Sequence, residues 1–144
     1  MPNSRYQYLE NIATADAAFE AYGATMEELF ANAALAMFNV IAPLNKIGVE
    51  SVRDVTVAAD SYDELLHNWL AELVYLKDVH GVLYSQFKVR IETRDVIQLA
   101  AEIHGDTIDS VREHTHTDVK AVTYHRLAIV RRENGLVATV VLDL

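Results

Sequence analysis

Two stretches of the chain combine a capping signal with a long apolar stripe at helical spacing, and they constrain the fold most. Thr25 to Glu28 and Ser61 to Glu64 are capping boxes, in which the hydroxyl bonds to a first-turn amide and the glutamate reciprocates. Pro43 stops the first predicted helix and Gly81 closes the second. The stripes are Leu29, Phe30, Ala33, Met37, Phe38 and Ile41, then Leu65, Leu66, Trp69, Leu70, Leu73 and Leu76. Each helix therefore needs a sheet to bury its apolar face.

Most of the remaining chain is typical of β-strands. Residues 87–92 alternate between apolar and charged side chains, which is the period of a half-buried strand. Asn134-Gly135 predicts a type I′ hairpin turn, and the polar residues 105–116 predict a loop. Further strands are predicted at residues 6–9, 17–22, 49–58, 96–104, 119–124, 127–130 and 136–142. Residues 1–144 are therefore expected to form one α+β domain, a two-layer sandwich of two amphipathic helices on a largely antiparallel β-sheet.

The chain is acidic, with a formal net charge of −9 and a pI of about 5.0. Its basic residues are scattered, and the only adjacent pair, Arg131 and Arg132, lies beside the predicted hairpin turn. Strong direct binding to nucleic acid needs a cationic surface that displaces counterions from phosphates, so we do not expect such binding. An acidic protein that works on RNA is better suited to docking on a basic enzyme, because opposite potentials steer the encounter.

The composition also bears on the compartment. No apolar run approaches the ~20 residues of a membrane span, and residues 1–5 lack the basic and apolar regions of a signal peptide. With no cysteine, the chain has no disulfide framework and no thiolate metal site. We therefore expect a cytoplasmic protein without a membrane partner.

The histidines are candidates for chemistry only by residue type. The sequence has no Gly-rich phosphate loop and no CxxC, HExxH or GxSxG pattern. His114 and His116 have the alternate spacing that suits a borderline metal in an extended segment, but they are half a site and loop histidines are usually solvated. His67 lies beside the stripe of the second helix and is expected at the surface or at its boundary.

Lys120 is the only charged residue of the predicted strand 119–124. Because side chains alternate along a strand, it is expected on the same face as Val122 and Tyr124. The simplest interpretation is a solvated lysine on the wet face of an antiparallel sheet. His125 ends this segment and could form a hydrogen bond near a site, although its position alone assigns it no role.

Asp16 and Asp143 each have a local and a functional interpretation. Locally, Asp16 would bond backbone amides in a turn, and Asp143 would be a polar residue at a frayed chain end. The last strand runs apolar through Leu142 to Leu144, however, so a sheet would hold Asp143 and the terminal carboxylate of Leu144 in fixed positions. Clustered carboxylates repel one another, and they persist beside a lysine or a hard divalent cation.

A series of short motifs, in order over nearly the whole chain, resembles the archease family. The motifs are Thr14-Ala15-Asp16, Ala21-Tyr22-Gly23, Glu28-Leu29-Phe30, Asn32-Ala33-Ala34, residues 65–70 (Leu-Leu-x-Asn-Trp-Leu), residues 119–124 (Val-Lys-Ala-Val-Thr-Tyr) and the final Leu142-Asp143. Two positions depart from the family pattern. Members often have a histidine where this chain has Ala13, and a glycine where it has Arg126.

The resemblance implies a non-enzymatic accessory protein that activates the tRNA-splicing ligase RtcB in tRNA splicing and repair. It would promote guanylylation of the ligase histidine and multiple turnovers of RNA joining. The family residues that match Asp16, Lys120 and Asp143 are needed for this, and the carboxylates bind a divalent metal. We therefore expect Asp16, Asp143 and the Leu144 carboxylate to hold Ca²⁺, Mg²⁺ or Mn²⁺. Lys120 would balance their charge or contact phosphate, with His125 as a possible accessory residue.

Two other interpretations remain open. The family is also associated with a chaperone or specificity role toward a tRNA cytosine-5 methyltransferase, which would not require the metal site. A metal-dependent hydrolase could use Asp16, Asp143 and Lys120 directly, but the sequence offers it no evident nucleophile or substrate pocket. Only the hydrolase predicts activity without a partner.

Overall fold

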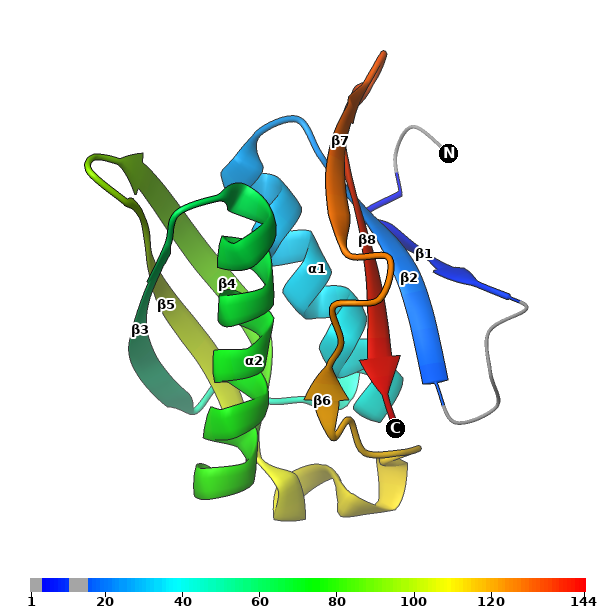
Figure 1. The fold of residues 1–144 in the computed structure, drawn as a ribbon. Helices are drawn as coiled ribbons and strands as arrows, with labels where there is room; N and C mark the ends of the chain where they lie inside the picture. The colour runs from blue at the N-terminus through cyan, green and yellow to red at the C-terminus, as the bar shows by residue number, and fades with distance from the viewer. Residues whose placement is uncertain (1–3, 11–15) are drawn as a thin grey trace.

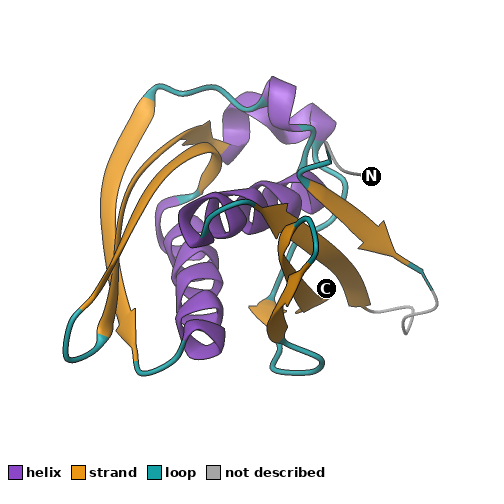
Figure 2. Cartoon of the chain, turned by 90° about the horizontal axis from the view of Figure 1, so that it is seen from above, coloured by secondary structure: helices purple, strands orange, loops and turns teal. Residues whose placement is uncertain are grey.

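The helices of this protein lie between two antiparallel β-sheets (Figures 1 and 2). The computed structural model describes residues 4–10 and 16–144. The helical elements are α1 (Met26–Ile41), η1 (Leu44–Lys46), α2 (Tyr62–His80) and η2 (Ile108–His114), of which η1 and η2 are 3-10 helices. The strands are β1 (Tyr6–Leu9), β2 (Asp16–Gly23), β3 (Ser51–Ala59), β4 (Val82–Thr93), β5 (Ile97–Thr107), β6 (Ala121–Val122), β7 (Ala128–Arg132) and β8 (Gly135–Asp143).

Both α-helices begin at the predicted capping boxes. In α1, Thr25 Oγ1 accepts a hydrogen bond from the Glu28 amide at 3.1 Å, and Glu28 Oε1 accepts one from the Ala24 amide at 2.9 Å. In α2, Ser61 Oγ accepts a hydrogen bond from the Glu64 amide at 3.2 Å. Gly81 ends α2 with a φ of 64°, a left-handed conformation that glycine adopts without strain. Every residue of the two predicted stripes is buried. Within residues 4–10 and 16–144, no helix is long and apolar enough to cross a membrane.

The strands form one sheet in the order β1-β2-β8-β6, with β7 also paired to β8, and a second sheet in the order β3-β5-β4. Helix α1 contacts β2 and β8 in the first sheet and β4 in the second. Helix α2 contacts β3, β4 and β5 on one side and β6 on the other. The predicted α+β class, with helices packed on antiparallel strands, is confirmed. The strands divide into two sheets, so the two helices form a middle layer (Figure 2).

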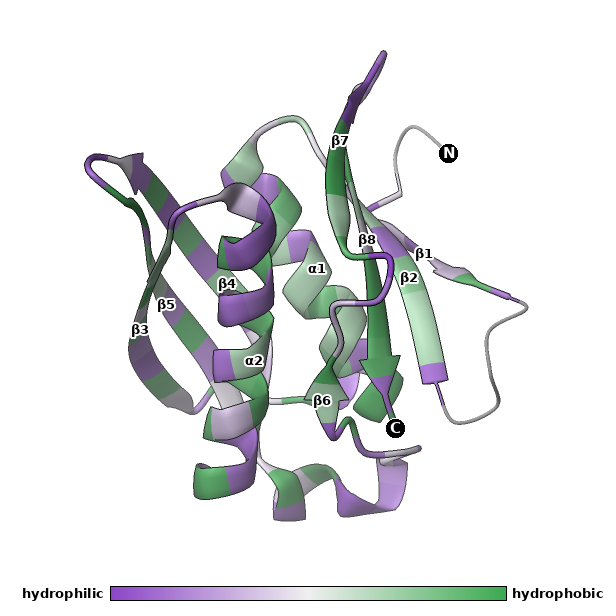
Figure 3. Ribbon diagram, in the orientation of Figure 1, coloured by the Kyte–Doolittle hydropathy of each residue, from purple (hydrophilic) through white to green (hydrophobic). Residues whose placement is uncertain are grey.

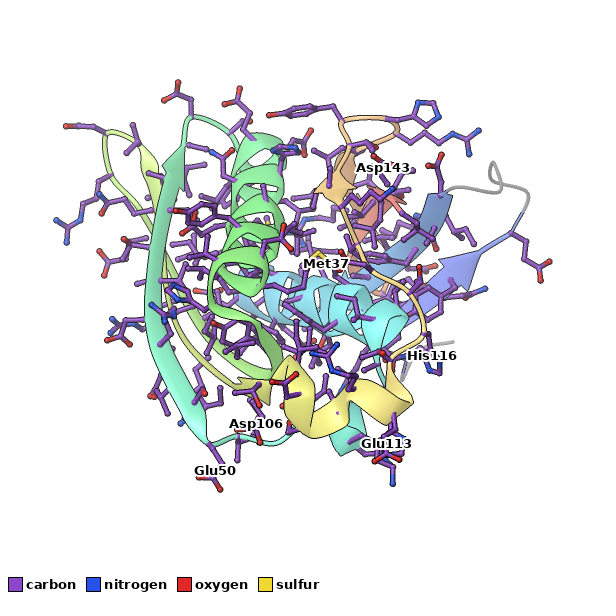
Figure 4. All side chains as sticks on the ribbon, turned by 90° about the horizontal axis from the view of Figure 1, so that it is seen from below. Met37, Glu50, Asp106, Glu113, His116 and Asp143 are labelled. Atoms are coloured by element: carbon purple, nitrogen blue, oxygen red, sulfur yellow. The ribbon has the colours of Figure 1, made fainter. Side chains whose placement is uncertain are left out.

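The apolar core fills the space between the sheets, and Met37 lies near its centre (Figure 4). Trp69 of α2 is fully buried, and its indole Nε1–H donates to the Phe30 carbonyl oxygen of α1 at 3.0 Å. The same ring packs edge-on against Phe87 of β4, with 6.0 Å between ring centroids. Trp69 therefore joins both helices to the second sheet.

Residues 105–116 are not the continuous loop that their polarity predicts. Strand β5 continues to Thr107, and residues 108–114 form η2. The reason is the apolar Val111, which η2 buries to 2% exposure against the core. Ile108 of η2 is half-buried against the same core, so two apolar side chains order a segment that is otherwise polar.

The β7–β8 hairpin also differs from its prediction. Arg132 pairs with Gly135, so the two turn residues are Glu133 and Asn134. Gly135 has a φ of 133°, whereas Asn134 does not adopt a positive φ. A type I′ turn at Asn134-Gly135 needs a positive φ at both residues. The prediction is therefore wrong, because the turn residues lie one position earlier in the sequence.

Candidate functional site

The first sheet brings two acidic residues together. Asp16 begins β2 and Asp143 ends β8, and they are direct partners in the antiparallel register. Direct partners face the same side of a sheet with Cβ atoms about 5 Å apart. Asp143 is exposed and Asp16 is half-buried. Among the described residues, none forms a hydrogen bond or ion pair with either carboxylate. The turn before Asp16, in which a local role was predicted for it, falls on residues 11–15, outside the described residues.

The two carboxylates lie on the face of the first sheet that points away from the helices. Val140 and Leu142 of β8 belong to the core between the sheets, whereas Val141 and Asp143, at the alternate positions, do not. Strand β8 is mostly apolar up to Leu142 (Figure 3), and its last residue, Asp143, lies at the edge where β2, β6 and β8 meet (Figure 4). A large partner could reach both carboxylates at this edge.

Lys120 reaches the same edge through its backbone. Its amide donates a hydrogen bond to the Asp143 carbonyl oxygen at 2.8 Å, and Ala121, the next residue, is the register partner of Asp143. Asp143 therefore lies between Asp16 on one neighbouring strand and the Lys120 segment on the other. Three residues that are far apart in the sequence converge at the end of β8.

The strand around Lys120 is shorter and less regular than predicted. Strand β6 contains only Ala121 and Val122 instead of residues 119–124. Val119 and Val122 are both buried, whereas Lys120 and Ala121 between them are exposed. Because two consecutive exposed residues break the period of two, the predicted shared face of Lys120 and Val122 is wrong.

The donor atoms at this edge suit a hard divalent cation. Asp16 and Asp143 provide carboxylate oxygens, and the main-chain oxygens of Leu144 follow Asp143 directly. In the described part of the chain, no three or more His, Cys, Asp or Glu residues lie close enough to hold a metal. Ca²⁺ takes six to eight oxygen ligands and Mg²⁺ takes six, so an ion here would keep several positions for water or for a partner.

The candidate histidines lie in different parts of the molecule. His114 and His116 are exposed, and His116 lies on the side of the molecule that carries η2, away from Asp143 (Figure 4). His125 is exposed, and its backbone amide bonds to Thr123 Oγ1 at 3.2 Å. His67 is half-buried, as predicted for a boundary residue.

Lys77 is a buried cation that was not predicted from the sequence. Lys77, in the last turn of α2, has only 2% of its side chain exposed and bonds to Asp118, two residues before Lys120. A signal was present, because Lys77 follows Leu73 by four residues and therefore falls on the apolar stripe.

The backbone conformation at Arg126, where the family often has a glycine, explains that preference for glycine. Its φ of 57° makes it the only non-glycine residue with positive φ in residues 4–10 and 16–144. A side chain in this conformation costs about 1 kcal/mol or more, and glycine avoids that cost. The frequent glycine at this position of the family is therefore explained by the backbone.

The other departure from the family pattern, at Ala13, and the neighbouring Thr14 and Ala15 lie outside the described residues.

Comparison with known proteins gives a consistent result over this whole fold. The model of the Archease protein family matches residues 6–144. The chain is 39% identical to protein archease of Methanosarcina barkeri, covering 97% of this chain and 96% of that protein, and 35% identical to protein archease of Pyrococcus abyssi, covering 91% and 92%. The solution structure of Methanobacterium thermoautotrophicum protein 1598 superposes with a TM-score of 0.85 at 35% identity and full coverage of both chains. The crystal structure of an archease, a possible chaperone, from Thermotoga maritima shares the fold with a TM-score of 0.58 at 22% identity, covering 94% of this chain and 97% of that one.

Proposed function

Because this chain belongs to the archease family, we propose that it activates the tRNA-splicing ligase RtcB without catalysing a reaction itself. It would assist guanylylation of the ligase histidine and so support repeated rounds of RNA joining. The convergence of Asp16, Lys120 and Asp143 on the end of β8 carries this proposal. These are the residues to which the family resemblance assigns the activity, and the fold brings them to one exposed edge.

A divalent ion fits the donor atoms at this edge. Asp16, Asp143 and the main-chain oxygens of Leu144 would hold it, and its incomplete ligand set suits an ion that is shared with a partner. When bound, the ion would supply positive charge next to phosphate oxygens. The chain's own residues have simpler roles. Asp16 and Asp143 position the ion, and the exposed Lys120 side chain balances their charge or contacts phosphate.

The charge of the chain favours docking on a basic protein. A net charge of −9 gives an attractive field toward a cationic ligase surface, and this field is screened by salt.

The cavities of the described part include one of about 470 Å³ on the second sheet, lined by Thr56, Arg90 and Ala100 among others. This cavity lies on the other sheet from Asp16 and Asp143. This cavity therefore offers no substrate pocket for hydrolysis by Asp16, Asp143 and Lys120.

The direct test is multiple-turnover RNA joining by limiting RtcB, with and without this protein. We expect clear stimulation by the wild type, and a loss of roughly tenfold or more of that stimulation in each of Asp16→Asn, Lys120→Met and Asp143→Asn. Asp95→Asn, an exposed change in the β4–β5 turn, should stimulate like the wild type. Stimulation that is indifferent to all three site changes would contradict the proposed site.

A second candidate is a chaperone-like role toward a tRNA cytosine-5 methyltransferase. It is favoured by the description of the Thermotoga maritima protein as a possible chaperone. In that case this protein would keep the methyltransferase soluble or specific, and the site variants would be as effective as the wild type. A light-scattering assay of the methyltransferase with the wild type and Asp143→Asn separates the two roles.

A further inference from the structure

The segment that carries Lys120 has little sheet structure of its own. Strand β6 contains two residues and pairs with β8 only through Ala121 and Val122. The flanking bonds are from the Lys120 amide to the Asp143 carbonyl oxygen at 2.8 Å and from the Thr123 amide to the Val141 carbonyl oxygen at 3.0 Å. So short a pairing is marginal in water, and other contacts must hold the segment in place.

The first of these contacts comes from Lys77, at the C-terminal end of α2. Its ammonium group donates to Asp118 Oδ1 at 2.7 Å and to Asp78 Oδ1 at 2.5 Å. Lys77 has 2% of its side chain exposed, whereas the two aspartates are more than half exposed. A buried charge is strongly unfavourable without its partners, so the lysine holds Asp118 against α2. Val119, the next residue, is fully buried.

The second contact comes from His67, in the first half of α2. Its ring Nε2 lies 2.8 Å from the Val122 carbonyl oxygen, and its ring stacks on Tyr124 with 3.8 Å between centroids and 12° between planes. His67 Nδ1 is buried and has no hydrogen-bond partner among the described residues. Because a carbonyl oxygen can only accept, His67 Nε2–H donates this bond.

The two contacts match in spacing. Ten residues of helix separate His67 from Lys77, which is about 15 Å at 1.5 Å per residue. Four residues separate Asp118 from Val122, which spans at most about 13 Å at the 3.3 Å per residue of an extended strand. Helix α2 and the Lys120 segment therefore meet at both ends of the segment, with Lys120 and Ala121 exposed between the two contacts.

We propose that Lys77 and His67 are positioning residues, which hold residues 118–122 against α2 and thereby fix Lys120 beside Asp143. The effect on RNA joining rests on the proposed function. The holding of residues 118–122 by Lys77 and His67 does not depend on it. Neither residue touches a reacting group. They act by keeping the Lys120 backbone bonded to β8, so that the exposed lysine and the carboxylates keep one relative arrangement.

Asp118 and Asp78 offer a matched pair for the test. Both bond to the same ammonium group and both are more than half exposed, but only Asp118 belongs to the Lys120 segment. We expect Asp118→Ala to speed amide hydrogen exchange at Lys120 and Thr123 about tenfold or more, measured by NMR on the full chain. Asp78→Ala should leave both rates within about a factor of two, because its loss does not release the segment. Equal effects of the two changes, or unchanged exchange in Asp118→Ala, would overturn the proposal.

The opposite end of the segment has its own matched pair on α2. His67→Phe keeps a ring against Tyr124 but removes the bond to Val122, and it should speed exchange at Thr123 about tenfold. Asn68→Leu removes the neighbouring bond to the Ala58 carbonyl oxygen of β3 and should leave Thr123 unchanged. Faster exchange at Thr123 in Asn68→Leu but not in His67→Phe would overturn this half of the proposal.

The joining assay tests the functional consequence. Asp118→Ala should lower the stimulation of RtcB, and Asp118→Glu should restore it, because a longer exposed carboxylate still reaches Lys77. Full stimulation by Asp118→Ala despite faster exchange would overturn the positioning role. If the wild type does not stimulate the ligase, the proposed function fails, and the exchange rates still decide whether α2 holds the segment.

Discussion

Replacing Trp69 by alanine is expected to lower the free energy of unfolding by about 4–5 kcal/mol. Removing a fully buried aromatic side chain costs about 3–5 kcal/mol, and here the indole bond to the Phe30 carbonyl oxygen is lost as well. Trp69 is also the side chain that joins both helices to β4 through Phe87. Because domains are stable by about 5–15 kcal/mol, this change removes a large share of the total. Urea unfolding followed by circular dichroism measures it.

The matched control is Trp69→Phe. Phenylalanine keeps most of the apolar contact and removes the indole N–H, so a loss of about 1–2 kcal/mol is expected. If the alanine variant lost no more than the phenylalanine variant, Trp69 would not have the central packing role that its burial indicates.

A divalent ion is expected to raise the melting temperature of the wild type by roughly 10 °C. Binding to the folded state at a hundred times the dissociation constant adds about 2.7 kcal/mol, and a domain of this size gains a few degrees per kcal/mol. The reason is the pairing of Asp16 with Asp143, which repel one another until a cation lies between them. Differential scanning fluorimetry with Ca²⁺, Mg²⁺ or Mn²⁺ added to EDTA-treated protein measures the shift and ranks the ions.

Variants of the two aspartates should change stability in opposite directions without and with the metal ion. Without metal, Asp143→Asn should be as stable as the wild type or up to about 1 kcal/mol more stable, because one repulsive charge is removed. With metal, the same variant and Asp16→Asn should lose the shift, whereas Asp95→Asn in the exposed β4–β5 turn should keep it. An equal shift in all four proteins would mean that the ion binds elsewhere.

The helices were predictable because their signals are local. Thr25 and Ser61 begin the two helices through bonds within one turn, and the apolar stripes follow from the 3.6-residue period. The division of the strands into two sheets was not predictable in this way. Alternation shows which face of a strand is buried, but not which strand is its neighbour.

The site residues also could not be placed next to one another from the sequence. The resemblance identified Asp16, Lys120 and Asp143, but only the register of β2 and β6 on β8 brings them to one edge. The strand predicted around Lys120 was too long, because contacts from Lys77 and His67 determine the path of that segment. Such contacts span 41 and 55 residues of sequence and leave no local signal beyond a lysine on an apolar stripe.

The most direct test of the central claim is single-turnover guanylylation of RtcB, measured as label transferred from radioactive GTP to the ligase. We expect wild-type protein to raise the rate of ligase–guanylate formation, and Asp143→Asn, with its fold intact, to lose this effect. That result would assign the activity to the edge where β2, β6 and β8 meet. An equal rate with wild-type protein, with Asp143→Asn and with neither would contradict the account.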